Sequence, residues 1–320
     1  MPATPMRLRT LAGLLRDRAG MLALFLLMFA ILAFAVPNFF TWANMMELAL
    51  SVSMVGMVAC TMLLCLASGD FDLSVEAVVA SAGVLAAVVI GATNSVALGI
   101  LAGVVAGGVV GLTNGVVIAY FGVNALITTL STMQIVRGLG FIVAGGAAVP
   151  IVREEFFVLG MGSLFSVPYP VWITLACFLL FAFVLNHTAF GRHTLAIGGN
   201  REATRLSGIP VERVKIVIFT LQGLMAGFAG VILTSRFTSG QPNSGVGFSL
   251  DVISACVLGG VSLSGGVGTV TGVVVGVLIM GTVQDVMSLL NVPTFSQYVA
   301  RGVILLAAVL FDQLKNRFGR

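Results

Sequence analysis

The sequence predicts an all-α bundle of membrane-spanning helices, and its composition and apolar runs are the basis for this. Of the 320 residues, 58% are hydrophobic and only 9% are charged, and the mean hydropathy is +1.11. A soluble domain carries roughly 25% charged residues, so this chain needs lipid around much of its surface. Its apolar runs are long and unbroken, which is typical of helices and not of the alternating strands of a membrane barrel.

Apolar runs separated by turn residues predict about ten spans in a single domain that covers residues 1–320. The spans are 20–36, 46–66, 73–92, 95–119, 124–145, 170–187, 214–235, 251–262, 268–287 and 295–311. The eighth is too short to cross a bilayer straight, so we expect a broken or re-entrant helix there. We expect the first to be an uncut span, although Ala33-Phe34-Ala35 imitates a cleavage site.

Basic residues gather where ten crossings from a cytoplasmic N-terminus would place the cytoplasm. They are Arg7, Arg9, Arg16 and Arg18, then Arg192, Arg201, Arg205, Arg213 and Lys215, then Lys315, Arg317 and Arg320. Both termini are therefore expected to be cytoplasmic, and residues 146–169 to form a periplasmic loop. The first and last five spans would then have opposite orientations, which permits a five-plus-five inverted repeat.

Glycines recur every four residues along the fourth predicted span, at Gly99, Gly103, Gly107, Gly111 and Gly115. A shorter run, at Gly268, Gly272 and Gly276, falls at the ninth span. Small residues on one helix face let two backbones approach closely. Such a face fits a tight internal bundle, a contact between subunits or the lining of a pore.

Several function classes are excluded by what the sequence lacks. Neither Lys215 nor Lys315 follows a glycine in the way a phosphate-binding loop requires, so we expect no ATP site. No nucleophile–base arrangement or metal-ligand spacing is present, so we expect no cofactor, no metal and no enzyme activity. No basic patch with interleaved aromatic residues suggests nucleic acid. The four cysteines lie in apolar segments, and we interpret them as small core residues.

One long polar segment, at about residues 190–215, has the signals of a short cytoplasmic helix. Asn200 can cap it, Glu202 suits its N-terminal end, and Gly208 followed by Pro210 can end it. The segment could dock a partner, or it could be a basic loop held by anionic lipid. The residues assigned to docking are Gly199, Asn200, Arg201, Glu202, Ala203, Thr204, Arg205, Leu206, Gly208 and Ile209.

Other polar residues fall in or beside the predicted spans, where they are costly. Neutral amides and hydroxyls could line a sugar path, and they could equally hold helices together; the acids could cap a helix or form a gate. A buried arginine should face protein or water. The candidates for a path or gate are Asp70, Asp72, Asn124, Thr128, Gln134, Arg137, Gln297 and Arg301.

Motifs over nearly the whole chain resemble those of a known family. They are SGDFDLSV, NALITTLSTMQIVRG, FGRHTLAIGGNREATRLSGIPVERVK, SGQP, DVISACVLGGVSLSGGVG and FSQYVARGVILLAAVLFD. The chain resembles permease subunits of bacterial sugar ABC importers, the ribose, galactose and arabinose group, and is most similar to the L-arabinose permeases. The resemblance implies a homodimer of permeases, a cytoplasmic ATPase with two nucleotide-binding cassettes, and a periplasmic sugar-binding protein.

The expected function is therefore import of a pentose, L-arabinose by resemblance, through the inner membrane by alternating access. A permease for another monosaccharide remains open, as do an ion-driven secondary transporter and a passive channel. An ion-driven transporter needs an ionisable group near mid-membrane. The acids Glu47, Asp70, Asp72, Glu76, Asp251 and Asp285 all fall near span ends in the sequence, which argues against that class.

Overall fold

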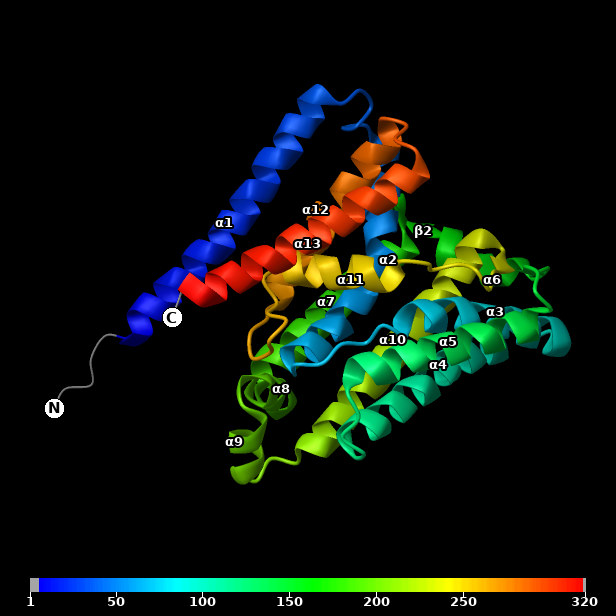
Figure 1. Cartoon of the computed structure of the whole chain (residues 1–320). Coiled ribbons are helices and arrows are strands. Elements are labelled where there is room, and N and C mark those ends of the chain that lie inside the picture. The colour runs from blue at the N-terminus through cyan, green and yellow to red at the C-terminus, as the bar shows by residue number, and fades with distance from the viewer. Residues whose placement is uncertain (1–5, 319–320) are drawn as a thin grey trace.

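The computed structural model describes residues 6–318 and is built almost entirely of helices (Figure 1). The helices are α1 (Met6–Ala35), α2 (Trp42–Ala67), α3 (Val75–Thr93), α4 (Val96–Ala119), α5 (Ala125–Ala144), α6 (Glu154–Met161), α7 (Tyr169–His187), α8 (Ala189–Gly199), α9 (Arg201–Leu206), α10 (Val211–Phe237), α11 (Phe248–Leu258), α12 (Val270–Leu289) and α13 (Thr294–Phe318).

Each of the ten predicted spans coincides with a helix. Seven of the described helices, α2, α3, α4, α5, α7, α10 and α12, are long and apolar enough to cross a membrane. The other three apolar stretches, Gly20–Ala35, Phe248–Leu258 and Thr294–Leu310, are shorter. The helical fold class is confirmed, whereas ten crossings and the positions of the termini stay predictions. The side chains of Arg7, Arg9, Arg16, Arg18, Lys315, Arg317 and Arg320, which support that topology, lie outside the described residues.

The tightest packing in the bundle joins α4 to α3 and α10. The glycine row of α4 faces these two helices: a Cβ on Gly111 would overlap the carbonyl oxygen of Phe219, and one on Gly103 would crowd the carbonyl oxygen of Ala82. Gly223 of α10 faces Gly107 in return. The internal-bundle interpretation of the glycine row is therefore confirmed, because close backbone approach is what holds helices together without a hydrophobic force between them.

Two helices, α3 and α11, begin inside the bundle. Residues Val75 to Ala80, the start of α3, are all buried, and so are Ser249 and Asp251 in the first turn of α11. Helix α3 packs against α10, α4 and α5, and α11 packs against α2, α12 and α13. The eighth predicted span is indeed short, at eleven residues. A buried helix start leaves its first N–H groups in need of partners.

The predicted outer loop, 146–169, is structured. It contains α6 and three two-residue strands, β1 (Val149–Pro150), β2 (Ser163–Leu164) and β3 (Val167–Pro168). β2 pairs with β3, and β1 pairs with β4 (Ser239–Gly240), which follows α10. The β1–β4 pair ties this loop to the chain segment that leads into α11.

We predict that Gly111→Ala destabilises the protein, because its Cβ would meet backbone atoms of α10 that cannot move aside. The matched control is Gly91→Ala in α3, where nothing lies within 4 Å of the added Cβ. That control should be neutral or slightly stabilising. Thermal unfolding of the two purified variants in detergent is the measurement, and equal midpoints would contradict the proposed packing.

Candidate translocation and coupling site

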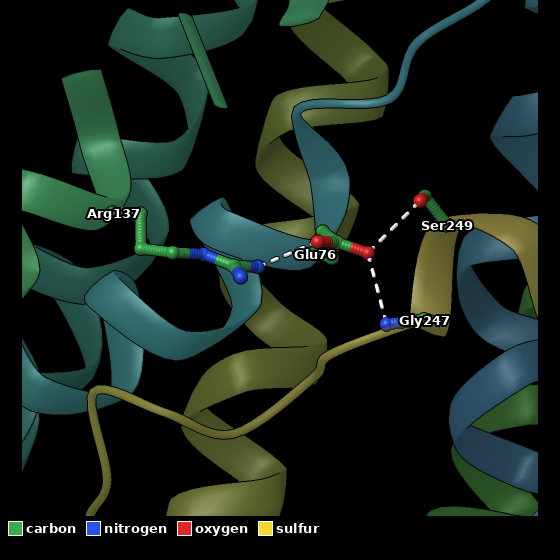
Figure 2. A network of polar contacts seen from close by, with 4 residues as sticks. All are labelled: Glu76, Arg137, Gly247 and Ser249. Atoms are coloured by element: carbon green, nitrogen blue, oxygen red, sulfur yellow. Dashed lines mark hydrogen bonds and ion pairs between the residues drawn. The ribbon is translucent and has the colours of Figure 1, made fainter. Parts of the chain in front are cut away.

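The carboxylate of Glu76, on the first turn of α3, joins three helices (Figure 2). One oxygen, Oε1, accepts from the guanidinium of Arg137 in α5. The other, Oε2, accepts from the backbone N–H of Gly247 at 3.0 Å and from the hydroxyl of Ser249 at 3.1 Å. Gly247 is the N-cap of α11, so the carboxylate also lies where the helix dipole favours negative charge.

A second buried ion pair links α11 to α13. The guanidinium of Arg301 lies 3.1 Å from Oδ2 of Asp251, and the ring of Tyr298 stacks on the same guanidinium. Both arginines predicted to face protein thus have a buried carboxylate partner. Glu76 and Asp251 lie on first turns, near the ends of their helices as the sequence predicts, and those turns are buried inside the bundle.

Asp72, in the connection between α2 and α3, starts a chain of hydrogen bonds that leads to α5. Its Oδ1 accepts from the backbone N–H and the hydroxyl of Ser74, at 2.9 and 2.6 Å. Asn114 of α4 donates to Ser74, and Thr132 of α5 donates to Asn114. Asp72 lies in the connection that precedes α3. Burial raises the pKa of its carboxyl to about 6, and the Ser74 hydrogen bonds limit that rise.

Asp70 forms a buried ion pair with Lys215. Nζ of Lys215 lies 2.7 Å from Oδ2 of Asp70. Lys215 is only 4% exposed. Because α10 begins at Val211, Lys215 lies within the second turn of that helix. The pair connects the base of α10 to the chain between α2 and α3.

The predicted docking helix is present as α9. The side chain of Asn200 accepts from the backbone N–H of Ala203 at 2.9 Å, as the capping prediction requires. Figure 1 shows α9 projecting at the edge of the molecule. Leu206 is 80% exposed, Ala203, Arg201 and Arg205 are exposed, and Ile209 is half-buried. A leucine exposed to this extent on a short capped helix is available to a partner.

Helix α8 connects α9 to the bundle. At its end, Gly198 lies against the carbonyl oxygen of Ala67, the last residue of α2, and a Cβ there would overlap that oxygen. The same oxygen accepts from the backbone N–H of Gly266 at 2.9 Å. The glycine-rich turn of the DVISACVLGGVSLSGGVG motif therefore meets both α8 and α2. Helix α8, which adjoins α9, is thus packed directly against the end of α2 and the turn after α11.

Four of the predicted path residues have local roles in the structure. Asn124 caps α5 by accepting from the N–H of Leu126, and the hydroxyl of Thr128 donates to the carbonyl of Asn124. Gln134 lies on an exposed face of α5. Gln297 donates to the carbonyl of Val292 at the start of α13. These contacts do not bring the four residues together, so their part in a path stays a prediction.

Sequence reasoning did not select several residues that the structure brings together. Glu76, Asp251 and Lys215 are missing from the predicted sites although they complete the ion pairs of Arg137, Arg301 and Asp70. The sequence did indicate that partners such as Glu76 and Asp251 must exist, because an arginine inside a span needs a group of opposite charge. The partner's identity could not be read, because each pair joins residues at least 50 positions apart.

Comparison with known proteins gives the family. Residues 44–309 match a family described as the permease component of the branched-chain amino acid transport system. The chain belongs to this permease family. The match covers the residues of the ion pairs and the docking helix. As a member of this family with seven helices long enough to cross a bilayer, this permease is a multi-pass protein of the inner membrane and a transport component, not an enzyme.

Its curated relatives are named for sugars. The permease is 58% identical to the L-arabinose transport system permease protein AraH of Escherichia coli, over 96% of this chain and 94% of that one. It is 55% identical to the L-arabinose ABC transporter permease protein AraH of Azospirillum brasilense, over 98% and 92%. Identity to the ribose import permease protein RbsC of E. coli is 37%, over 94% and 95%. No solved structure matches the chain.

We predict that Lys215→Met lowers the stability of the permease by about 3–5 kcal/mol, because it leaves the Asp70 carboxylate buried and unpaired. Arg213→Met is the matched control, two positions away on an exposed part of the same helix, and should change stability by less than about 0.5 kcal/mol. Denaturation in detergent measures both. A Lys215→Met protein as stable as the control would show that the ion pair is not buried.

Proposed function

We propose that this permease is the membrane-spanning subunit of an ATP-driven importer that moves a pentose, L-arabinose, from the periplasm to the cytoplasm. The observation that carries the proposal is α9: an exposed, capped helix with Leu206 at its surface, on a chain with no phosphate-binding loop in its sequence. Such a surface fits a cytoplasmic ATPase with two nucleotide-binding cassettes. A periplasmic sugar-binding protein would deliver the sugar, and a second permease copy would complete the complex.

The proposed coupling begins where the ATPase moves α9. Helix α8 passes the motion to the end of α2 at Ala67 and to the turn at Gly266. The Asp70–Lys215 pair passes it to the base of α10 and to the chain entering α3. These contacts join discrete packed elements, and such elements support two-state rearrangements. Alternating access follows if the bundle has one arrangement open to each side.

Ten crossings with an inverted repeat fit the arrangement of the helices. With α6, α8 and α9 set aside, α3 and α5 are the third and fifth helices of the first half, and α11 and α13 are the third and fifth of the second. Each of these two pairs carries one buried acid–arginine bridge, Glu76–Arg137 and Asp251–Arg301. Matching bridges at matching positions support an inverted repeat of the two halves. The cytoplasmic position of both termini is supported separately, by the distribution of basic residues in the sequence.

An ion-driven transporter is the weaker alternative. It needs a buried carboxylate that is free to bind and release an ion. Glu76, Asp251 and Asp70 each hold a cationic partner among the described residues, and Asp72 accepts two hydrogen bonds from Ser74. A permease for another monosaccharide is the stronger alternative, because the ribose permeases also align over nearly the full chain.

We predict that Leu206→Asp abolishes ATP-driven uptake while membrane insertion stays normal. A charge buried in an apolar docking contact without a partner costs several kcal/mol, enough for about a tenfold or greater loss of ATPase binding. Ser207→Asp is the control, because it adds the same charge one position away, at an exposed polar residue. Uptake into vesicles and co-purification of the ATPase are measured together. Equal activity of the two variants would contradict docking at Leu206.

The substrate is tested with the reconstituted complex. Binding proteins loaded with L-arabinose, D-ribose, D-galactose or L-leucine are added separately, and stimulation of ATP hydrolysis is measured. Stimulation should be largest with L-arabinose, because the permeases named for it are the more similar relatives. Stimulation only by a hexose or by L-leucine would contradict pentose import. Uptake should also survive collapse of the proton gradient and stop without ATP.

A further inference from the structure

A cavity of about 370 Å³ lies between α2, α3, α10, α11 and α12, on the side of the bundle away from α9. Its mouth is formed by exposed residues, among them Phe237, Asn243 and Val246, which follow or end α10. Its floor includes the buried residues Val79 and Asp251. Because α10 begins near the docking helix and ends at this mouth, the cavity opens toward the face opposite the proposed ATPase.

The lining combines neutral polar side chains with aromatic rings. Gln241, Asn243, Ser244 and Gln284 supply amide and hydroxyl groups. Phe237 and Phe248 supply apolar surface. The volume falls within the range of small-molecule sites, which are apolar with a few placed polar groups. Amides that both donate and accept suit a ligand whose hydroxyls do the same.

The charges at the cavity are already paired, which bears on the class of ligand. Arg236 lies 3.0 Å from a carboxylate oxygen of Glu47, and Asp251 is bound to Arg301. A zwitterionic amino acid needs an opposite charge for its ammonium and for its carboxylate. The Arg236–Glu47 pair is largely exposed and costs little to break. The ammonium group would have to displace Arg301 from the buried carboxylate of Asp251, which would leave Arg301 unpaired. A neutral polyol needs neither.

The segment that carries Gln241 and Asn243 is fixed at both ends. At one end, β4 pairs with β1 through Ser239 and Gly240. At the other, Gly247 donates its backbone N–H to Glu76, and Figure 2 shows this contact beside Ser249. The SGQP motif thus presents its glutamine to the cavity from an anchored segment. Fixed donors lose less entropy when a ligand binds.

From this geometry we infer that the cavity is an outward-facing subsite for a neutral monosaccharide, with Gln241, Asn243 and Gln284 bonding its hydroxyls. The inference rests on the proposed import function and adds the residues that receive the sugar. Helices α10 and α11, which wall the cavity, are also those that carry Lys215 and Asp251. A shift of either helix during the transport cycle would therefore reshape the site.

Cysteine labelling tests the subsite without an ATPase. Cys60, Cys65 and Cys256 are buried and Cys177 is half-buried, so Cys177→Ala gives a quiet background. Val246→Cys is then added at the mouth of the cavity. The full-length variant in proteoliposomes is labelled with a water-soluble maleimide in the presence of L-arabinose, D-ribose or L-leucine. A monosaccharide should slow labelling severalfold, and L-leucine should not.

Two further variants link the protection to the named amides. Gln284→Leu and Asn243→Leu should each raise the sugar concentration for half-protection about tenfold, the loss expected for one missing hydrogen bond to the ligand. Asn186→Leu, on an exposed part of α7, is the control and should leave the sugar concentration for half-protection unchanged. No protection by any monosaccharide, equal protection by L-leucine, or protection that is indifferent to Gln284 and Asn243 would overturn the inference.

The labelling result is separable from the test of import. Protection by D-ribose in preference to L-arabinose would support the subsite and change only the proposed substrate. ATP-driven uptake of L-arabinose with no protection of Val246→Cys would leave the proposed function standing and remove this cavity from it.

Discussion

The structure depends on one buried carboxylate. Glu76 receives the guanidinium of Arg137 and two donors at the start of α11, so α3, α5 and α11 meet at one charge. Without it, the N–H of Gly247, the hydroxyl of Ser249 and the guanidinium of Arg137 would lose this partner, and leaving such groups unpaired in the bundle is costly. The two helices that begin inside the bundle are therefore mutually dependent. Strand β4 and the segment that carries Gln241 and Asn243 also depend on Glu76, because both lie on the stretch of chain that Glu76 anchors at Gly247.

This anchoring gives a physical route by which the proposed docking helix α9 could act on a distant cavity. The contacts from α9 run through Gly198 to the end of α2, and through Lys215 to the connection into α3. Glu76 lies on the first turn of α3 and holds the segment that carries Gln241 and Asn243. The ion pairs, together with the hydrogen-bond chain from Asp72 to Thr132, are polar links between helices of a mainly apolar bundle.

Much of the fold could be predicted from the sequence, and the site only in part. The ten apolar runs, the glycine face of α4 and the Asn200 cap depend on local patterns, and these are present as expected. Arg137 and Arg301 were recognised because charge inside a span is costly wherever it falls. Their partners were missed because a pairing over 61 or 50 positions leaves no local trace. Lys215, the partner of Asp70, was missed for the same reason, because nothing local in the sequence connects the two residues.

A double-mutant cycle on Glu76→Gln and Arg137→Met tests the central claim most directly, with the free energy of unfolding in detergent as the readout. Each single variant leaves one buried charge without its partner and should lose about 3–5 kcal/mol. The double variant removes both charges and should be more stable than Arg137→Met alone. Losses that simply add, to within about 0.5 kcal/mol, would show that the two groups do not interact and that α3, α5 and α11 are held together by something else.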